Sequence, residues 1–148
     1  MRKEKDFKDL MDNIQKKINK QEETTFSKVV IDEYNDPCYF GFIEKPDAFG
    51  KIKGPCGDTM QIFIKIKNKV VKDARFWTDG CGATVACGNR LIKIIRNKTL
   101  DEIADLSQEK LIDELDGLPD EHLHCAKLSV DTLKLALSEY KKKRYKTK

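Results

Sequence analysis

Three cysteines in unusual surroundings are the residues of this sequence best suited to chemistry. Cys56 lies within Gly-Pro-Cys-Gly-Asp, Cys81 lies between two glycines, and Cys125 directly follows a histidine. Glycine lacks a Cβ atom, so the backbone beside the first two thiols can approach a large inorganic ligand closely. Asp58 and His124 add a carboxylate oxygen and an imidazole nitrogen. Three sulfurs with one oxygen or nitrogen suit a tetrahedral zinc or iron site, so we predict a metal ion or an iron–sulfur cluster rather than a disulfide.

The predicted positions of these thiols favour the thiolate form, which is the form that binds metals. Cys81 precedes a predicted helix and Cys125 lies near the start of another. Helix N-termini and nearby cations lower a thiol pKa from about 8.5 to about 7 or below. Asp58 follows Cys56 by two residues, so both side chains point to the same side of an extended chain. His124 and Cys125 project about 100° apart on a helix and can address one centre from two angles.

The remaining cysteines and the other histidine have simpler interpretations. Cys87 follows Cys81 by six residues in a helical pattern, so we predict that it packs in the core and faces away from the site. Cys38 follows a turn and is predicted to be a loop thiol, although a role as an extra ligand or resolving thiol stays open. His122 is predicted to be a surface residue at the start of a helix.

Composition limits the class of protein. The 148 residues suffice for one domain with its own core. A charged fraction of 36% and the lack of an apolar run of about 20 residues argue against a membrane span. Five cysteines are an odd count without a secretory leader, which favours a cytoplasmic protein with metal or redox chemistry. Much of the net charge of +4 lies in the last eight residues, which we interpret as a solvated helix end and not as a nucleic-acid site.

The N-terminal part of the chain is predicted to be helical and then irregular. Residues 1–22 form an amphipathic helix with apolar residues at helical spacing, namely Phe7, Leu10, Met11, Ile14 and Ile18. A second, short helix runs through Tyr34 and ends at Asn35-Asp36-Pro37, because proline cannot continue it. Residues 36–57 are predicted to form loops around one edge strand.

A β-hairpin is the clearest local prediction. Alternating apolar residues predict a first strand with one buried face, namely Met60, Ile62, Ile64 and Ile66. Asn68-Lys69 can form the turn. The chain then returns from Val70 to Thr78, with one face made by Val70, Ala74 and Phe76 and the other by Trp77.

Helices follow to the C-terminus. Residues 83–96 predict one helix, Thr99 and Glu102 form a capping box for the next, and Ser107 can cap a further short helix. After the break at 117–119, Asp120 is predicted to cap a last helix, whose apolar stripe is Ala126, Val130, Leu133, Leu137 and Tyr140. This order predicts an α+β fold, a small three-stranded antiparallel sheet packed with several helices. We divide the chain into an N-terminal helical extension (1–22), a main domain (23–143) and a basic tail (144–148).

Five stretches carry a more specific pattern. They read VIDEYNDP at 30–37, PCGDTM at 55–60, VKDARF at 71–76, GCGA at 80–83 and LPDEHLHC at 118–125. In this order they resemble the iron–sulfur cluster assembly scaffolds of the IscU type, a fold also found at the N-terminus of NifU. The resemblance covers residues 26–143 and leaves the N-terminal helix as an extension, which could mediate self-association.

The resemblance implies that the site holds a nascent [2Fe–2S] cluster. By position the ligands are Cys56, Cys81 and Cys125, completed by Asp58 or His124. It also implies a cysteine desulfurase that supplies persulfide sulfur, with Cys125 as the first candidate acceptor, and apo-proteins that receive the finished cluster. Iron is the expected metal and zinc an alternative occupant, and a homodimer that shares one cluster stays open.

One departure from the family concerns chaperones. The family's recognition segment usually reads Leu-Pro-Pro-Val-Lys, whereas this chain has Leu-Pro-Asp-Glu-His at 118–122. Dedicated delivery by an Hsp70-type chaperone is therefore not expected.

Two other functions stay open beside that of a scaffold without enzymatic turnover. A zinc-dependent sulfurtransferase resembling SufU would use the same ligands to accept persulfide sulfur. Such chains usually carry an insertion between the second and third cysteines, and only 43 residues separate Cys81 from Cys125 here. The other is a module with structural zinc that binds nucleic acid through the basic tail.

Overall fold

The computed structural model describes residues 26–55 and 57–146 of the chain. The predicted helix over 1–22 and the predicted ligand Cys56 lie outside these residues. The elements, in order, are α2 (Lys28–Asn35), β1 (Ala48–Lys53), β2 (Thr59–Lys67), β3 (Val70–Thr78), α3 (Gly82–Ile95), α4 (Leu100–Ala104), α5 (Gln108–Glu114), the 3-10 turn η1 (Asp120–His122) and α6 (Leu123–Lys146). None of the helices in the described part is both long and apolar enough to span a bilayer.

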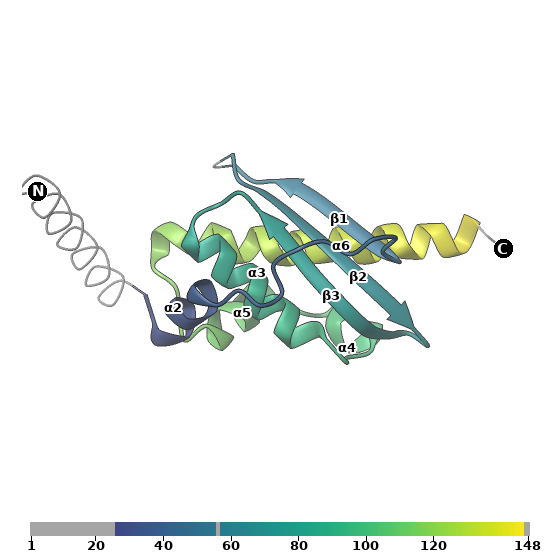
Figure 1. Cartoon of the computed structure of the whole chain (residues 1–148), viewed down its shortest axis with the longest axis horizontal. Helices are drawn as coiled ribbons and strands as arrows, with labels where there is room; N and C mark the ends of the chain where they lie inside the picture. The colour runs from purple at the N-terminus through teal and green to yellow at the C-terminus, as the bar shows by residue number, and fades with distance from the viewer. Residues whose placement is uncertain (1–25, 56, 147–148) are drawn as a thin grey trace, which may run out of the picture.

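The three strands form one antiparallel sheet in the order β1-β2-β3. β1 lies at the edge and pairs with β2, from Ala48 opposite Ile64 to Lys53 opposite Thr59. One face of the sheet is covered by helices, because α6 packs on β1 and β2 while α3 packs on β3 (Figure 1). The α+β fold with a three-stranded antiparallel sheet is thus confirmed.

The β2–β3 hairpin turns where the sequence predicts. Asn68 and Lys69 have φ angles of 55° and 62°, both in the left-handed region. Two such residues in succession form the type I′ turn, whose twist matches that of the flanking strands.

One strand residue faces differently from the prediction because β3 contains a bulge. Successive residues of β2 pair with Val71 and Asp73, which leaves Lys72 as an extra residue. The bulge shifts the alternation of β3, so Val71 is fully buried while Val70 is only partly buried. The prediction that Val70 faces the core is therefore wrong.

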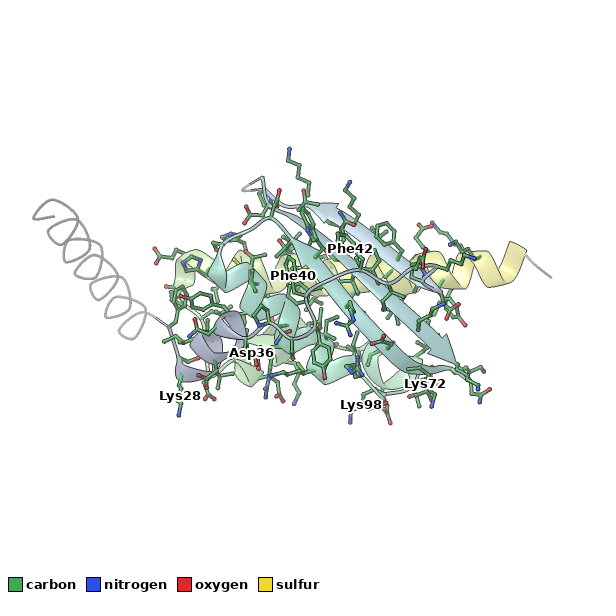
Figure 2. All side chains as sticks on the ribbon, viewed as in Figure 1. Lys28, Asp36, Phe40, Phe42, Lys72 and Lys98 are labelled. Carbon is green, nitrogen blue, oxygen red and sulfur yellow. The ribbon has the colours of Figure 1, made fainter. Side chains whose placement is uncertain are left out.

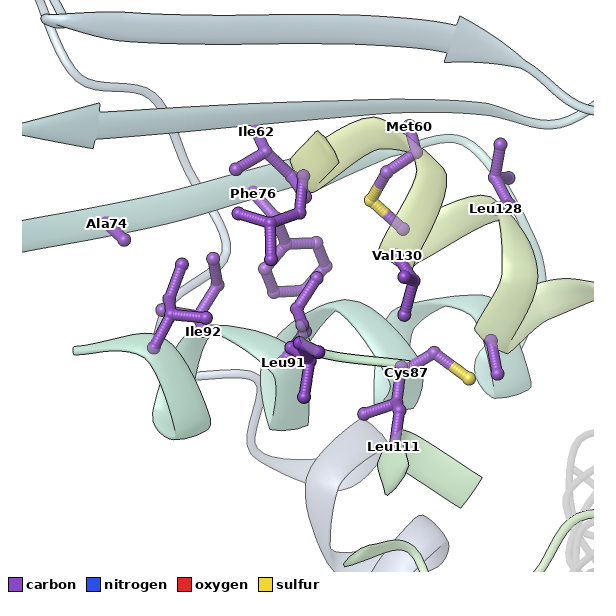
Figure 3. Packing of buried hydrophobic residues seen from close by; sticks show 14 of the residues in the cluster. Met60, Ile62, Ala74, Phe76, Cys87, Leu91, Ile92, Leu111, Leu128 and Val130 are labelled. Atoms are coloured by element: carbon purple, nitrogen blue, oxygen red, sulfur yellow. The ribbon is translucent and has the colours of Figure 1, made fainter. Parts of the chain in front are cut away.

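Buried residues from the sheet, α3 and α6 form one core (Figure 3). Phe76 of β3 packs so closely on α3 that a Cβ atom at Gly88 would lie 2.5 Å from its ring. Cys87 is fully buried in the same cluster, as predicted, and burial raises the pKa of its thiol. The predicted stripe of α6 faces this core, with Ala126, Val130, Leu133 and Leu137 buried and Tyr140 packed at its margin.

Side-chain caps begin the shorter helices as predicted. Thr99 and Glu102 form the complete capping box of α4, and the Ser107 hydroxyl accepts a hydrogen bond from the backbone of α5. The start of α6 differs, since Asp120 is the first residue of η1 and Pro119 precedes it as the cap. Asp120 therefore does not cap α6. The 3-10 turn takes up the three residues before the helix proper.

α2 is tied to α3 by a buried carboxylate. Glu33 is only 4% exposed, and its oxygens accept hydrogen bonds from Asn89, Arg90 and Lys93 of α3. The ring of the next residue, Tyr34, lies against Gly82, the first residue of α3. The Glu33 contacts fasten α2 to the second half of α3, and the Tyr34 contact lies at its first residue, next to Cys81.

The other face of the sheet exposes aromatic side chains. Phe42, labelled in Figure 2, is 64% exposed. Its ring stacks on Trp77 with centroids 6.5 Å apart and meets the edge of Phe63 at 5.4 Å. Trp77 thus faces away from the core, as the alternation predicts. Cys38 is exposed in the loop that leads to this segment, as expected of a loop thiol.

Candidate metal centre

Two junctions between elements bring the described site residues together. β3 ends at Thr78, and Cys81 then caps the N-terminus of α3. His122 ends η1, and Cys125 lies in the first turn of α6. Packing of α3 against α6 places these two helix starts side by side.

Cys81, His122 and Cys125 form a compact group of potential ligands. One ligand atom from each residue lies within 4.8 Å of the other two. Cys81 is exposed, Cys125 is fully buried, and His122 lies between these extremes. The structure therefore brings together two of the three predicted cysteines and adds a histidine that we expected at the surface.

Asp58 reaches this group through Thr84. The Thr84 hydroxyl lies 3.4 Å from Asp58 Oδ2, 3.3 Å from Cys125 Sγ and 3.7 Å from Cys81 Sγ. Position 80 has to be glycine, because a Cβ atom there would lie 2.8 Å from both the Asp58 carboxylate and the Thr84 hydroxyl. The glycine before the second cysteine thus admits an oxygen donor to the edge of the site.

Backbone hydrogen bonds join Gly54, Gly57 and Asp58, which flank Cys56 in the sequence. The Gly54 amide donates to the Asp58 carbonyl at 2.7 Å, and the Gly57 amide donates to the Gly54 carbonyl at 3.0 Å. Gly57 has a φ of 88°, a left-handed conformation that favours glycine. This loop carries Asp58 to the site.

His124 lies beside the site in a different relation to the sulfurs. Its Nε2 is 3.7 Å from Cys125 Sγ, and its ring stacks with that of His122 at a centroid distance of 6.4 Å. A nitrogen-to-sulfur distance of this size suits either a weak hydrogen bond to the thiol or two ligand atoms that share one metal ion.

The two thiols of the described site differ in acidity. A hydrogen bond from the Cys125 thiol is the largest cause that lowers the pKa of Cys81 to about 4, and the Thr84 and Ala83 groups at the start of α3 add to it. The same pairing, together with burial, raises the pKa of Cys125. At neutral pH the site therefore presents one exposed thiolate and one buried thiol.

This donor set fits a thiophilic metal. Two sulfurs and one imidazole from two rigid helix starts match zinc, ferrous iron or an edge of an iron–sulfur cluster. The buried Nδ1 of His122 has no hydrogen-bond partner in the described part of the chain. From the sequence we assigned His122 to the surface, although its spacing of three from Cys125 places both residues on one side of a helical segment.

Comparison with known proteins gives one consistent family. A family model described as the NifU-like N terminal domain matches residues 25–147. The iron-sulfur cluster assembly scaffold protein IscU of Escherichia coli strain K12 is 35% identical over an alignment of 124 positions, which covers 80% of this chain and 96% of that protein. The scaffold protein IscU 1 of Archaeoglobus fulgidus is 34% identical over 119 residues, covering 80% and 78% of the two chains.

Solved structures share the fold. The N-terminal part of a NifU-like protein from Brucella abortus has a TM-score of 0.63 at 17% identity and covers 79% of this chain and 94% of that one. A putative iron-sulfur cluster assembly scaffold protein for the SUF system from Fervidobacterium islandicum has a TM-score of 0.64 at 21% identity, with coverage of 76% and 96%. At these identities the likeness shows the fold alone.

Proposed function

The chain belongs to the family of NifU-like N-terminal domains, and on that premise we propose that it is a scaffold on which iron–sulfur clusters are assembled and from which they pass to apo-proteins. The observation that carries this proposal is the meeting of Cys81 and Cys125 at two helix starts, one as an exposed thiolate and one as a buried thiol. The cluster is cargo, so the protein is a platform and not an enzyme with turnover.

We propose that the cargo is a [2Fe–2S] cluster held by Cys56, Cys81 and Cys125. Asp58 and His124 are the candidates proposed from the sequence for the remaining position. A hard carboxylate is a poorer match than a thiolate for a soft cluster, so Asp58 in that position would favour release of the cluster. The contact from Asp58 to Thr84, and from Thr84 to both sulfurs, supports a place for Asp58 at the edge of the site.

Sulfur would reach the scaffold as a persulfide on a cysteine desulfurase. The acceptor thiolate attacks the outer persulfide sulfur, a new sulfur–sulfur bond forms, and the desulfurase cysteine leaves as a thiolate. Cys125 is the proposed acceptor, and because it is the protonated member of the pair, it loses its proton as it attacks, and the proton ends on the thiolate that leaves the desulfurase. Reduction of the transferred sulfur to sulfide then needs an external electron donor.

Burial sets a condition on this step. Cys125 is fully buried, so the residues that cover it have to move before the persulfide of a desulfurase can reach that sulfur. If the exposed Cys81 accepts the sulfur instead, no such movement is needed. Mass spectrometry of the persulfidated peptides, after reaction with a desulfurase and cysteine, distinguishes these two acceptors.

Iron, zinc and acid-labile sulfide per chain test the scaffold proposal. The protein is reconstituted anaerobically with both metals, cysteine and a desulfurase. We expect iron and sulfide in equal amounts, lost together in Cys81→Ala and Cys125→Ala and retained in Cys38→Ala, which removes an exposed thiol outside the site. Zinc without iron or sulfide would contradict the proposal.

A zinc-dependent sulfurtransferase is the second candidate. The group of two cysteines and one histidine is a common zinc donor set, which favours this candidate beyond the resemblance alone. It would bind zinc tightly, carry persulfide on one thiol and take up no stable iron. The reconstitution described above separates the two functions.

The proposed function implies two kinds of partner, a cysteine desulfurase that supplies sulfur and apo-proteins that accept the cluster. We also propose a cytoplasmic location, because free thiols and a labile cluster need a reducing environment. A homodimer that shares one cluster is compatible with this function.

A further inference from the structure

We propose that Thr84 positions Asp58 as the exchangeable oxygen donor of the metal centre. The inference rests on the proposed function and assigns a positioning residue to the same site. Thr84 acts through the Asp58 carboxylate and is itself neither a ligand nor an acceptor of sulfur.

The Thr84 hydroxyl lies between the carboxylate and the sulfurs. Thr84 is the third residue of α3, and its side chain is fully buried. Its Oγ1 lies 3.4 Å from Asp58 Oδ2, 3.3 Å from Cys125 Sγ and 3.7 Å from Cys81 Sγ. A buried hydroxyl cannot turn to solvent for a hydrogen bond, so it depends on partners such as these within the protein.

The single proton of this hydroxyl can be donated to one acceptor at a time. Sulfur is a weaker acceptor than oxygen, and a hydrogen bond to a carboxylate is strengthened by the charge of the carboxylate. When Cys81 and Cys125 bind a metal, part of the electron density of their sulfurs is also engaged in the metal–sulfur bonds. The proton of Thr84 then goes to Asp58, which ties the carboxylate of a metal-loaded site to α3.

The Asp58 side chain depends on this hydrogen bond more than its backbone does. The Asp58 carbonyl accepts a hydrogen bond from the Gly54 amide at 2.7 Å, and the amide of the next residue, Thr59, donates to Asp79 Oδ1 at 2.7 Å. These bonds fix the backbone whatever the side chain does. Asp58 is partly exposed at the edge of the site, where its carboxylate can rotate into solvent, and the Thr84 hydroxyl holds it toward the sulfurs.

Gly80 leaves the space in which the two side chains meet. A Cβ atom at this position would lie 2.8 Å from Asp58 Oδ2 and equally close to Thr84 Oγ1. The hydroxyl and the carboxylate therefore share a gap that only glycine leaves open. Their contact is thus part of the packing at the β3–α3 junction and not a chance approach of a surface carboxylate.

An oxygen donor held in this way binds a metal weakly and reversibly. A hydrogen bond to the carboxylate withdraws electron density from it, and the same hydroxyl receives the carboxylate when it leaves the metal. Its place is then free for a thiolate of an apo-protein, which is a better ligand for a soft cluster. Without the hydroxyl, the carboxylate turns to solvent and release of the cluster slows, as in a chain that lacks Asp58.

Retention of the cluster against a chelator measures this role on the full chain, loaded as described above. Thr84→Val keeps the shape of the side chain and removes its hydroxyl, whereas Thr84→Ser keeps the hydroxyl. We expect Thr84→Val to lengthen the half-life of the cluster by the same factor as Asp58→Ala, about two- to tenfold, which is the range that one hydrogen bond can account for. Thr84→Ser should keep the half-life of the original chain.

Cadmium alone provides a readout that needs neither iron nor sulfide. The ¹¹³Cd chemical shift in NMR depends strongly on whether sulfur, nitrogen or oxygen atoms bind the ion. We expect the original chain and Thr84→Ser to share one shift, and Thr84→Val and Asp58→Ala to share another. Thr84→Ala removes the same hydroxyl and should give the second shift too, so the result does not depend on the folding of one variant.

The double variant Thr84→Val/Asp58→Ala should match either single variant, because a residue that acts through another adds nothing once the other is removed. A further effect of Thr84→Val in that background would assign the hydroxyl directly to the sulfurs and overturn the proposal. A Thr84→Val chain with the original half-life and cadmium shift would overturn it too. If the original chain loads no iron or sulfide, the scaffold function fails, and the cadmium comparison alone decides the role of Thr84.

Discussion

At the scale of single residues, the contact between Cys81 and Cys125 sets the reactivity of the site. The Cys81 sulfur is exposed and accepts a hydrogen bond from the buried Cys125 thiol. Sequence reasoning found both thiols from their glycine and histidine neighbours and expected thiolates at helix starts. It gave no means to rank them, because the ranking depends on a contact between residues 44 positions apart and on the burial of only one of them.

The lowered pKa of Cys81 predicts an unusual pH profile for alkylation. A simple thiol with a pKa of about 8.5 reacts about tenfold more slowly with iodoacetamide for each pH unit below that value. Because the pKa of Cys81 is lowered to about 4, its alkylation rate should change little between about pH 5 and pH 8. Mass spectrometry of the metal-free chain measures this rate for the Cys81 peptide. In Cys125→Ala, which removes the largest cause of the shift, the rate should become pH-dependent.

The lowered pKa of Cys81 also makes the free energy of unfolding rise with pH. Between the ordinary value of 9.0 and about 4, folded Cys81 binds fewer protons than it does in the unfolded chain. Its contribution to the free energy of unfolding is therefore complete above pH 9.0, declines as the pH falls and is absent below about 4. An alkylation rate for Cys81 that rises tenfold per pH unit up to pH 8 would contradict both statements.

At the scale of elements, the sequence predicted what depends on local chemistry. The I′ turn at Asn68-Lys69, the capping box at Thr99 and the apolar stripe of α6 all follow from residues near one another in the chain. The bulge at Lys72 and the η1 turn at Asp120 did not follow, because pairing and packing against other elements decide them. The same limit explains His122, which becomes a site residue only when η1 packs beside the start of α3.

The buried Glu33 predicts strong dependence of stability on one carboxylate. Glu33→Ala would leave the buried amide of Asn89 and the ammonium of Lys93 without their acceptor, whereas Arg90 would keep Glu114. Water can reach both cations, which are 29% and 39% exposed, so the cost is mainly that of the unsatisfied Asn89 amide, about 1–3 kcal/mol of the free energy of unfolding. Urea denaturation monitored by circular dichroism measures the change.

Glu114→Ala is the matched control, because this half-buried carboxylate also pairs with Arg90, at 3.1 Å. It should cost no more than about 1 kcal/mol, as is usual for ion pairs near the surface. Equal costs for the two variants would mean that the Glu33 network does not fasten α2 to α3.

At the scale of the whole molecule, the site joins parts of the chain that are distant in sequence. The loop before β2 brings Asp58, the β3–α3 junction brings Cys81, and the η1–α6 junction brings His122 and Cys125. A metal bound there links the sheet to both central helices. The unfolded chain has no such preformed site, so metal binding and folding are coupled.

Zinc should therefore raise the unfolding temperature of the intact domain. A ligand that binds only the folded state adds about 2.7 kcal/mol to the free energy of unfolding when its free concentration is about 100 times its Kd. Calorimetry of the chain with and without zinc measures this shift, and a chelator should reverse it. Cys81→Ala should remove most of it, whereas Cys38→Ala should keep it, since Cys38 is an exposed thiol outside the site. An equal shift in both variants would place the stabilising zinc at some other position in the chain.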